Sequence, residues 1–211
     1  MNKVHNLFPT TIFESFIGVN KKEKNFLLNE NYEIISQNNI RNGLTSTDKF
    51  ILENKKYSSL KQKISKEINN YLYDLFQINK KTSFYITNSW CIKHEKNDKS
   101  FIHDHTNSLI SGVYYFNTPK NCGNIIFERN RYTNNLFSST LSLDLNKLNN
   151  FNSYHYSVEV KEGMLLLFPS HLLHFTEENL SNEQRCSLSF NVFFKGGIGN
   201  NQNLNRLYIW K

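Results

Sequence analysis

The sequence predicts an α+β chain that is mainly β, with a sandwich or jelly-roll core. Apolar residues recur at helical spacing only in the first part of the chain, and short runs typical of strands follow, separated by turn residues. A helical part followed by a series of strands is typical of this class. The 211 residues, 38% of them hydrophobic, suffice for one domain, in which residues 1–80 supply an N-terminal strand and supporting helices and residues 81–211 the jelly-roll core.

Composition limits the location and the partners. Cys91, Cys122 and Cys186 are odd in number and lack paired spacing, which argues against a disulfide framework or a zinc knuckle and favours a reducing compartment. The start resembles no signal peptide and no run is long enough to cross a bilayer, so we expect a cytoplasmic protein without a membrane partner. The net charge of +7 is spread over scattered lysine pairs, which indicates a solvated basic surface rather than a nucleic-acid site.

The first 80 residues predict one strand and two helices. Residues 7–16 alternate well enough for an edge strand, and Asn20 can cap a helix that runs to about residue 28. Turn residues over 32–48 indicate a loop. A capping box at Ser59 precedes a helix over 59–77, whose apolar stripe is Leu60, Ile64, Ile68, Leu72, Leu75 and Phe76.

The remaining residues predict strands at 83–94, 109–117, 124–128, 154–160, 164–168, 185–194 and 204–210. The Asn- and Ser-rich stretch 128–152 is expected to cross the mouth of the barrel as a long loop. The glycine cluster at 196–199 lacks the pattern of a phosphate loop and is interpreted as a bend.

The segment 164–191 is the most informative part of the chain. An apolar strand ends at Pro169, which cannot donate to a ladder, and His174 follows just past the corner. From Arg185 the pattern has period two, with Arg185, Ser187, Ser189 and Asn191 on one face and apolar residues on the other. The guanidinium of Arg185 matches a carboxylate, and the hydroxyl of Ser187 can assist it, so this face predicts a charged ligand inside the barrel.

Three histidines are placed to bind a metal. His103 and His105 share one face of an extended segment while Asp104 points away, and His174 can supply a third ligand from a distant corner. Such sets of ligands build non-haem iron sites. His171, three residues before His174, is an alternative ligand from the same corner, and Arg185 could instead form a structural ion pair with Glu177 or Glu178.

These motifs resemble the iron(II)- and 2-oxoglutarate-dependent dioxygenase superfamily, in particular a branch found in marine bacteria and phages. The resemblance covers nearly the whole chain and rests on Leu7-Phe8-Pro9-Thr10, Ser89-Trp90, Ser108-Leu109-Ile110-Ser111-Gly112-Val113-Tyr114-Tyr115, Phe168-Pro169-Ser170, His174 and Arg185-Cys186-Ser187-Leu188-Ser189-Phe190-Asn191. It implies a double-stranded β-helix (jelly roll) flanked by N-terminal helices, with Fe(II) and 2-oxoglutarate as cofactor and co-substrate. It also implies that His174 is the distal iron ligand and that Arg185, with Ser187, binds the far carboxylate of 2-oxoglutarate.

The first pair of ligands departs from the His-X-Asp/Glu pattern of the superfamily, because no carboxylate stands two residues after either histidine. Three arrangements are open. His103 and His105 can both ligate, as strand geometry favours; His105 can pair with the amide of Asn107; or a bulge can turn Asp104 inward.

The resemblance implies hydroxylation. The positive charge and the long loop after Glu128 suit an anionic small molecule, a peptide or a modified polymer as the substrate. Two other functions are compatible with the sequence. One is a cupin-like metalloprotein that does not use 2-oxoglutarate, and the other is a non-catalytic binding module on the same fold. The sequence predicts neither the substrate nor the oligomeric state.

Overall fold

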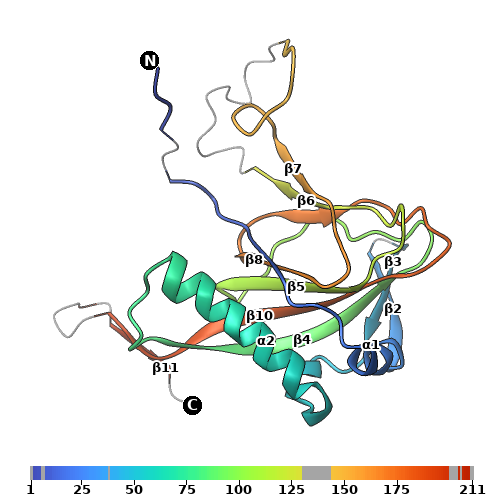
Figure 1. The fold of residues 1–211 in the computed structure, drawn as a ribbon, viewed down its shortest axis with the longest axis horizontal. Helices are drawn as coiled ribbons and strands as arrows, with labels where there is room; N and C mark the ends of the chain where they lie inside the picture. Colours follow the sequence, from blue (N-terminus) through green and yellow to red (C-terminus); the bar gives the residue numbers. More distant parts are fainter. Residues whose placement is uncertain are drawn as a thin grey trace.

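Two antiparallel sheets and two helices form the part of the chain that this computed structural model describes, residues 2–5, 8–37, 39–129, 144–199, 204 and 206–209 (Figure 1). The large sheet has the strand order β1-β8-β5-β10-β4-β3-β2, with β11 paired to β10, and the small sheet has the order β7-β6-β9. The strands of the large sheet are β1 Phe13–Phe16, β2 Tyr32–Gln37, β3 Ile40–Ser46, β4 Ser83–His94, β5 Ile110–Asn117, β8 Met164–Pro169, β10 Arg185–Ile198 and β11 Leu207–Ile209. Those of the small sheet are β6 Ile125–Glu128, β7 His155–Val158 and β9 His174–Thr176.

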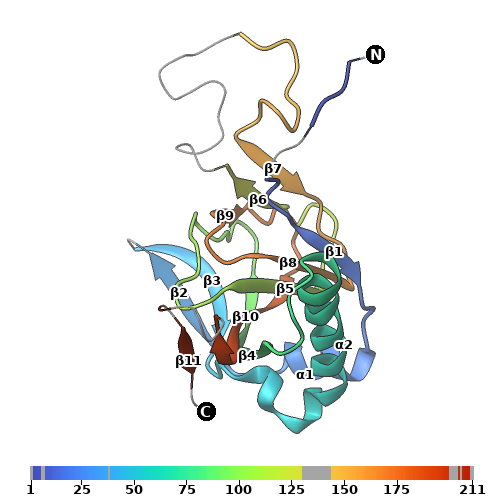
Figure 2. The ribbon, with the colours of Figure 1, turned by 90° about the vertical axis from the view of Figure 1, so that its left-hand side faces the viewer.

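From β5 to β10 the chain passes from the large sheet to the small sheet and back twice, and every pairing is antiparallel. This is the double-stranded β-helix, or jelly roll, that the resemblance implies. Both helices lie on one face of the large sheet and the small sheet lies over the other, as Figure 2 shows.

Two hydrophobic clusters follow from this layering. One joins the helices to the outer face of the large sheet, and the other fills the space between the sheets. The residues of β10 alternate between its two faces: Cys186, Leu188, Phe190 and Val192 lie in the outer cluster, whereas the opposite face carries Arg185 and Ser187. The predicted period of two on this strand is confirmed.

The two helices begin in different ways. α1, Lys21–Leu28, is capped by Asn20, whose side chain accepts from the backbone N–H groups of Lys22 and Glu23, as predicted. α2, Ser58–Asn69, follows the short 3-10 turns Ile51–Glu53 and Lys55–Tyr57 and has no capping box at Ser59. Instead the carboxylate of Glu23 accepts from the N–H of Leu60 at 3.1 Å.

The predicted helix over 59–77 changes its period before it ends. After α2 the chain forms the π-helical segment Asn70–Leu75, in which the N–H of Phe76 donates to the carbonyl of Tyr71. Leu60, Ile64, Ile68 and Leu72 are buried as predicted, but Leu75 and Phe76 remain 51% and 45% exposed because the wider turn rotates them off the apolar stripe.

Two expectations about loops need correction, and one strand was missed. Residues 32–48 are mostly the hairpin of β2 and β3, which extends the large sheet beyond β4. The glycines at 196 and 197 continue β10 and pair with β11, and β9 is a further strand that the sequence did not indicate. Of the long stretch 128–152, residues 130–143 lie outside the described residues.

The three cysteines are buried and unpaired, and burial raises the pKa of each thiol. Within the described part of the chain no helix is both long and apolar enough to cross a membrane.

Candidate metal centre

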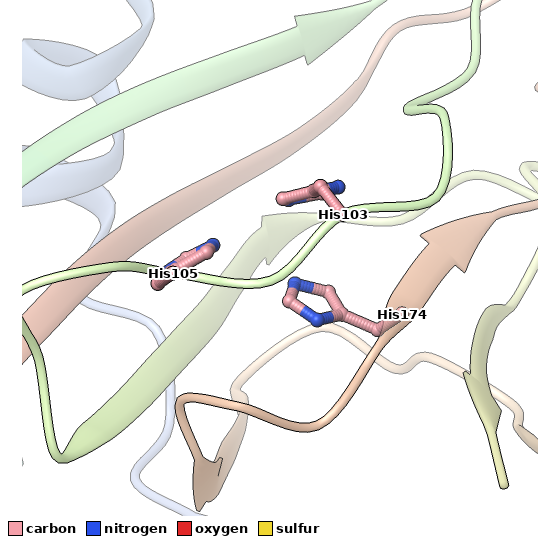
Figure 3. Close-up of side chains that lie close together, drawn as sticks. All are labelled: His103, His105 and His174. Carbon is pink, nitrogen blue, oxygen red and sulfur yellow. The ribbon is translucent and has the colours of Figure 1, made fainter. Parts of the chain in front are cut away.

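His103, His105 and His174 meet between the two sheets (Figure 3). An isolated β-bridge joins the segment before β5 to the start of β9, because His103 and His174 exchange both backbone hydrogen bonds at 3.0 Å. The three ring centroids lie 4.4 to 5.3 Å apart. Each side chain offers one nitrogen, and these nitrogens all lie within 4.8 Å of one another, a spacing at which a single metal ion can bind all three.

Hydrogen bonds fix the tautomer of each ring. Nδ1 of His103 lies 2.6 Å from the carbonyl of Phe101, and Nδ1 of His174 lies 2.9 Å from the carbonyl of Leu172. Nδ1 of His105 lies 2.6 Å from the side-chain oxygen Oδ1 of Asn191. A carbonyl oxygen can only accept, so each Nδ1 carries the proton and each Nε2 is left with a free lone pair. This is the state in which imidazole binds a metal.

Burial keeps two of the rings neutral. Burial and, to a smaller extent, the nearby His103 lower the pKa of His174 to about 3, and burial also lowers the pKa of His105. These imidazoles therefore need to release no proton before they bind a metal at neutral pH.

The alternative ligands lie elsewhere. Asp104 is exposed, and so is His171 on the turn before β9. Asn107 is exposed in a left-handed turn with φ 55°. In the described residues the three histidines are the group of His, Cys, Asp and Glu side chains that could hold a metal ion, and that group contains no carboxylate.

Asn191 is a site residue that the sequence reasoning did not select. Its Oδ1 accepts from His105 and from the hydroxyl of Ser111 at 3.0 Å, and the Ser111 hydroxyl lies 2.8 Å from the same Nδ1. Ser170 and Ser108 continue this chain of hydroxyls. The period of two on β10 was an available signal, because it places Asn191 on the same face as Arg185.

Arg185 lies at the other end of the same strand face. It is 2% exposed, its Nη1 donates to the carbonyl of Gly123 at 3.2 Å, and its Nη2 donates to Nδ1 of His94. Ser187 is next on this face, opposite the buried Tyr115 of β5. Burial lowers the pKa of Arg185, and the nearby Tyr115 opposes that shift.

No ion pair neutralises Arg185 among the described residues. Glu178 pairs with Lys99, and Glu177 accepts from the backbone N–H of Asn124. The alternative of a structural ion pair with either glutamate therefore finds no support. A buried guanidinium that has only neutral acceptors is suited to bind an anion.

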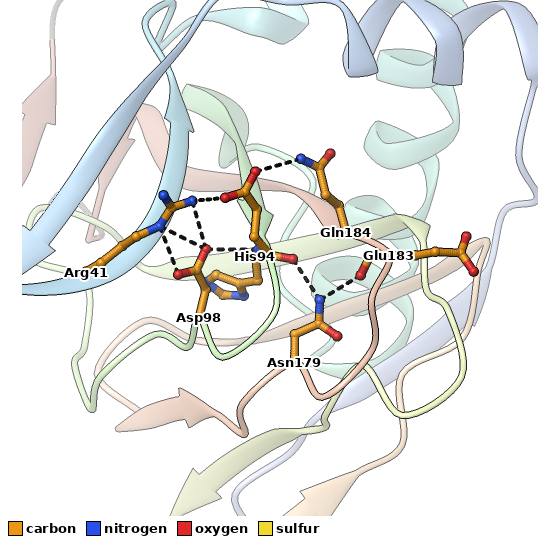
Figure 4. A network of polar contacts seen from close by, with 7 residues as sticks. Arg41, His94, Asp98, Asn179, Glu183 and Gln184 are labelled. Carbon is orange, nitrogen blue, oxygen red and sulfur yellow. Dashed lines mark hydrogen bonds and ion pairs between the residues drawn. The ribbon is translucent and has the colours of Figure 1, made fainter.

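Polar contacts fix the chain around this end of the barrel, as Figure 4 shows. Arg41 of β3 binds Glu95 and Asp98 in the turn after β4. Asn179, which is fully buried, donates to the backbone carbonyls of His94 and Glu183 at 2.8 Å each. The last residue of β4 and the loop that leads into β10 are thus held together.

The donor set fits an iron centre. Three imidazoles in one cluster match the ligands that iron, zinc, copper and nickel accept, and an open side remains at His103, whose side chain is exposed. A cationic anchor on the same inner face adds a place for an anionic group beside the metal. Together these features suit a metal centre that also binds a carboxylate.

Comparison with known proteins indicates a metal-dependent oxygenase. The profile of a family described as "Putative 2OG-Fe(II) oxygenase" matches residues 88–191, which include all three histidines, Arg185 and Asn191. No curated protein matches the chain.

Solved structures share the fold. The non-heme alpha ketoglutarate dependent carbocyclase SnoK from nogalamycin biosynthesis is 13% identical, with a TM-score of 0.61 over 89% of this chain and 81% of its own. An oxidoreductase of the 2OG-Fe(II) oxygenase family from Burkholderia pseudomallei is 8% identical, with a TM-score of 0.56 over 87% and 84%. HygX from Streptomyces hygroscopicus, crystallised with nickel, 2-oxoglutarate and hygromycin B, is 10% identical, with a TM-score of 0.54 over 87% and 82%. With the profile match over the site, the chain belongs to the 2OG-Fe(II) oxygenase family of enzymes.

Proposed function

We propose that this protein, as one domain over residues 1–211, is an Fe(II)- and 2-oxoglutarate-dependent hydroxylase. His103, His105 and His174 hold the iron, and Arg185 with Ser187 binds the far carboxylate of 2-oxoglutarate. The single observation that carries the proposal is a buried arginine that has no carboxylate partner among the described residues, on the strand face that also carries the partner of a metal-site histidine.

The length of that face supports the co-substrate assignment. Arg185 and Asn191 lie six residues apart on β10, which at roughly 3.3 Å per residue is about 20 Å. This span accommodates an arginine side chain, then a five-carbon keto diacid and then an imidazole-bound metal, one after another along the strand. Ser187 and Ser189 lie between the two ends and can donate to the bound diacid.

The residues of the chain bind and orient. Iron(II) with 2-oxoglutarate, when bound, supplies the oxidation in which one oxygen atom of O2 enters a substrate C–H bond while 2-oxoglutarate leaves as succinate and CO2. The Nδ1–H bonds hold the three rings so that their Nε2 atoms converge. Phe127 and Phe168, both within 6.1 Å of the His174 ring, exclude water from the buried side of the site.

The substrate reaches the site from the side of His103. The ring of Trp90 lies 5.8 Å from that of His105 and offers a flat surface for the substrate. We propose a small molecule or a peptide, and the net charge of +7 favours an anionic one. HygX, with hygromycin B bound, is an example of this fold holding a small molecule.

An anaerobic titration of the metal-free protein with iron(II) and 2-oxoglutarate tests the proposal. We expect the visible charge-transfer band that appears when a keto acid chelates iron. Arg185→Leu should weaken the binding of 2-oxoglutarate without loss of iron binding. His174→Ala should abolish iron binding and, with it, the charge-transfer band. His171→Ala is the matched control, because it changes an exposed histidine three residues away.

Two outcomes would contradict the proposal. Iron binding without any band would favour the cupin-like function without 2-oxoglutarate. Failure to bind iron at all would exclude the three histidines as a metal centre.

A further inference from the structure

His94 lies buried at the end of β4, directly opposite Arg185 in the register of β4 and β10. His94 is not a member of the cluster that His103, His105 and His174 form, and it lies opposite Arg185 at the start of β10. The residue is 2% exposed, so its ring contacts protein on every side. Its Nδ1 meets Nη2 of Arg185, and its Nε2 lies 3.2 Å from the hydroxyl of Ser100.

The protonation state of His94 follows from its partners. A guanidinium only donates hydrogen bonds, so Nδ1 of His94 must accept, and Nε2 carries the proton. Burial and, to a smaller extent, the charge of Arg185 lower the pKa of His94 to about 3, and a hydrogen bond with the backbone of Asn42 opposes both. The ring is therefore neutral at physiological pH.

The neutrality of this partner matters for what Arg185 can bind. A carboxylate in the place of His94 would hold the guanidinium equally well but would cancel its charge. The imidazole and the carbonyl of Gly123 orient two of the guanidinium nitrogens and leave the charge uncompensated.

We propose that His94 is a positioning residue for Arg185: it orients the guanidinium toward the carboxylate of a keto diacid without neutralising it. This inference rests on the proposed function, because it assumes that 2-oxoglutarate is the anion bound at Arg185. It adds a residue that sequence spacing alone does not connect to the site.

The surroundings of His94 are built to hold the ring in place. Gly43 of β3 has φ 129°, and a Cβ there would lie 2.7 Å from Cδ2 of His94 and 2.6 Å from the carbonyl of Lys93. The missing side chain at this position makes room for the ring. Asn179 binds the backbone carbonyl of His94 and that of Glu183, two residues before Arg185, so both partners are fixed in the main chain.

The test compares two keto acids on the iron-loaded protein under anaerobic conditions, with the charge-transfer band as readout. 2-Oxoglutarate has a far carboxylate and pyruvate has none. We expect His94→Leu to lower the affinity for 2-oxoglutarate about tenfold, which is the effect expected from the loss of one hydrogen bond to a charged group. Pyruvate affinity and iron affinity should not change, and His94→Gln, which keeps an acceptor, should recover most of the 2-oxoglutarate affinity.

A second variant makes the test independent of how well His94→Leu folds. His94→Glu places a carboxylate beside Arg185 and should abolish the preference for 2-oxoglutarate over pyruvate, while iron still binds. Equal 2-oxoglutarate affinity in wild type, His94→Leu and His94→Glu would overturn the inference, and so would an equal loss of both keto acids. A wild-type protein that forms the band with neither keto acid would instead contradict the proposed function itself.

Discussion

Replacing Asn191 by alanine should weaken iron binding although Asn191 is not a ligand. The change removes the acceptor 2.6 Å from Nδ1 of His105 and leaves this ring free to rotate or to change its tautomer. Loss of such a partner of a metal-bound histidine typically costs 10- to 100-fold in metal affinity, or about 1.4 to 3 kcal/mol.

The structure places the single variant at the lower end of this range. The hydroxyl of Ser111 lies 2.8 Å from the same nitrogen and can accept a hydrogen bond from its N–H group when Asn191 is replaced. We therefore expect about a tenfold loss for Asn191→Ala, and a loss approaching 100-fold for Asn191→Ala combined with Ser111→Ala. The excess of the loss in the pair over the sum of the two single losses is the coupling free energy that a double-mutant cycle measures.

Anaerobic competition of the protein with a chromophoric chelator for iron(II) gives the affinities. Ser189→Ala is the matched control, because it removes a hydroxyl from the same face of β10, two residues from Asn191. Denaturant unfolding of the metal-free proteins separates a loss of metal affinity from a loss of fold. If Asn191→Ala and the double variant both hold iron as tightly as wild type, the proposed orientation of His105 by Asn191 is wrong.

Three further predictions concern stability and the ligand set. The pKa of His94 is about 3 in the folded protein and 6.5 ordinarily, so between these values the unfolded chain binds a proton at His94 that the folded protein does not. This difference should reduce the free energy of unfolding by about 1.4 kcal/mol per pH unit as the pH falls from 6 toward 3. In denaturant titrations, the free energy of unfolding of His94→Gln should therefore fall less steeply with acid than that of wild type. Gly112→Ala should destabilise the fold by about 1 to 3 kcal/mol or more, since the added Cβ would lie 2.1 Å from the ring of Phe190. Adding Phe190→Leu to this variant should recover part of the loss. An unchanged unfolding midpoint for Gly112→Ala alone would contradict the close packing of Gly112 against Phe190. Asp104→Asn should leave iron affinity unchanged because the side chain is exposed and outside the histidine cluster, whereas loss of iron from this variant would mean that Asp104 ligates.

Local sequence patterns predicted the elements whose cause is local. The alternation on β10 reflects the two faces of one strand, and the cap at Asn20 and the strand end at Pro169 depend on a few neighbouring residues. The strand Ser83–His94 was predicted to the residue for the same reason.

The secondary-structure and capping predictions were wrong where contacts between distant parts of the chain determine the local structure. The hairpin of β2 and β3 has turn-rich composition, but it gains backbone partners on β4, about 50 residues later in the chain. Ser59 is not a helix cap because the carboxylate of Glu23 on another helix supplies the acceptor instead.

The sequence by itself determined the fold class, the family resemblance and the residue types of the site. Spacing could place His103 and His105 on one face, but it left three ligand sets open and did not decide between His171 and His174. Only the tertiary structure brought His174 against His103, gave His105 its partner Asn191 and set His94 against Arg185. The physical reason is that each of these contacts depends on the register between strands far apart in the chain, which many weak interactions across both sheets set together.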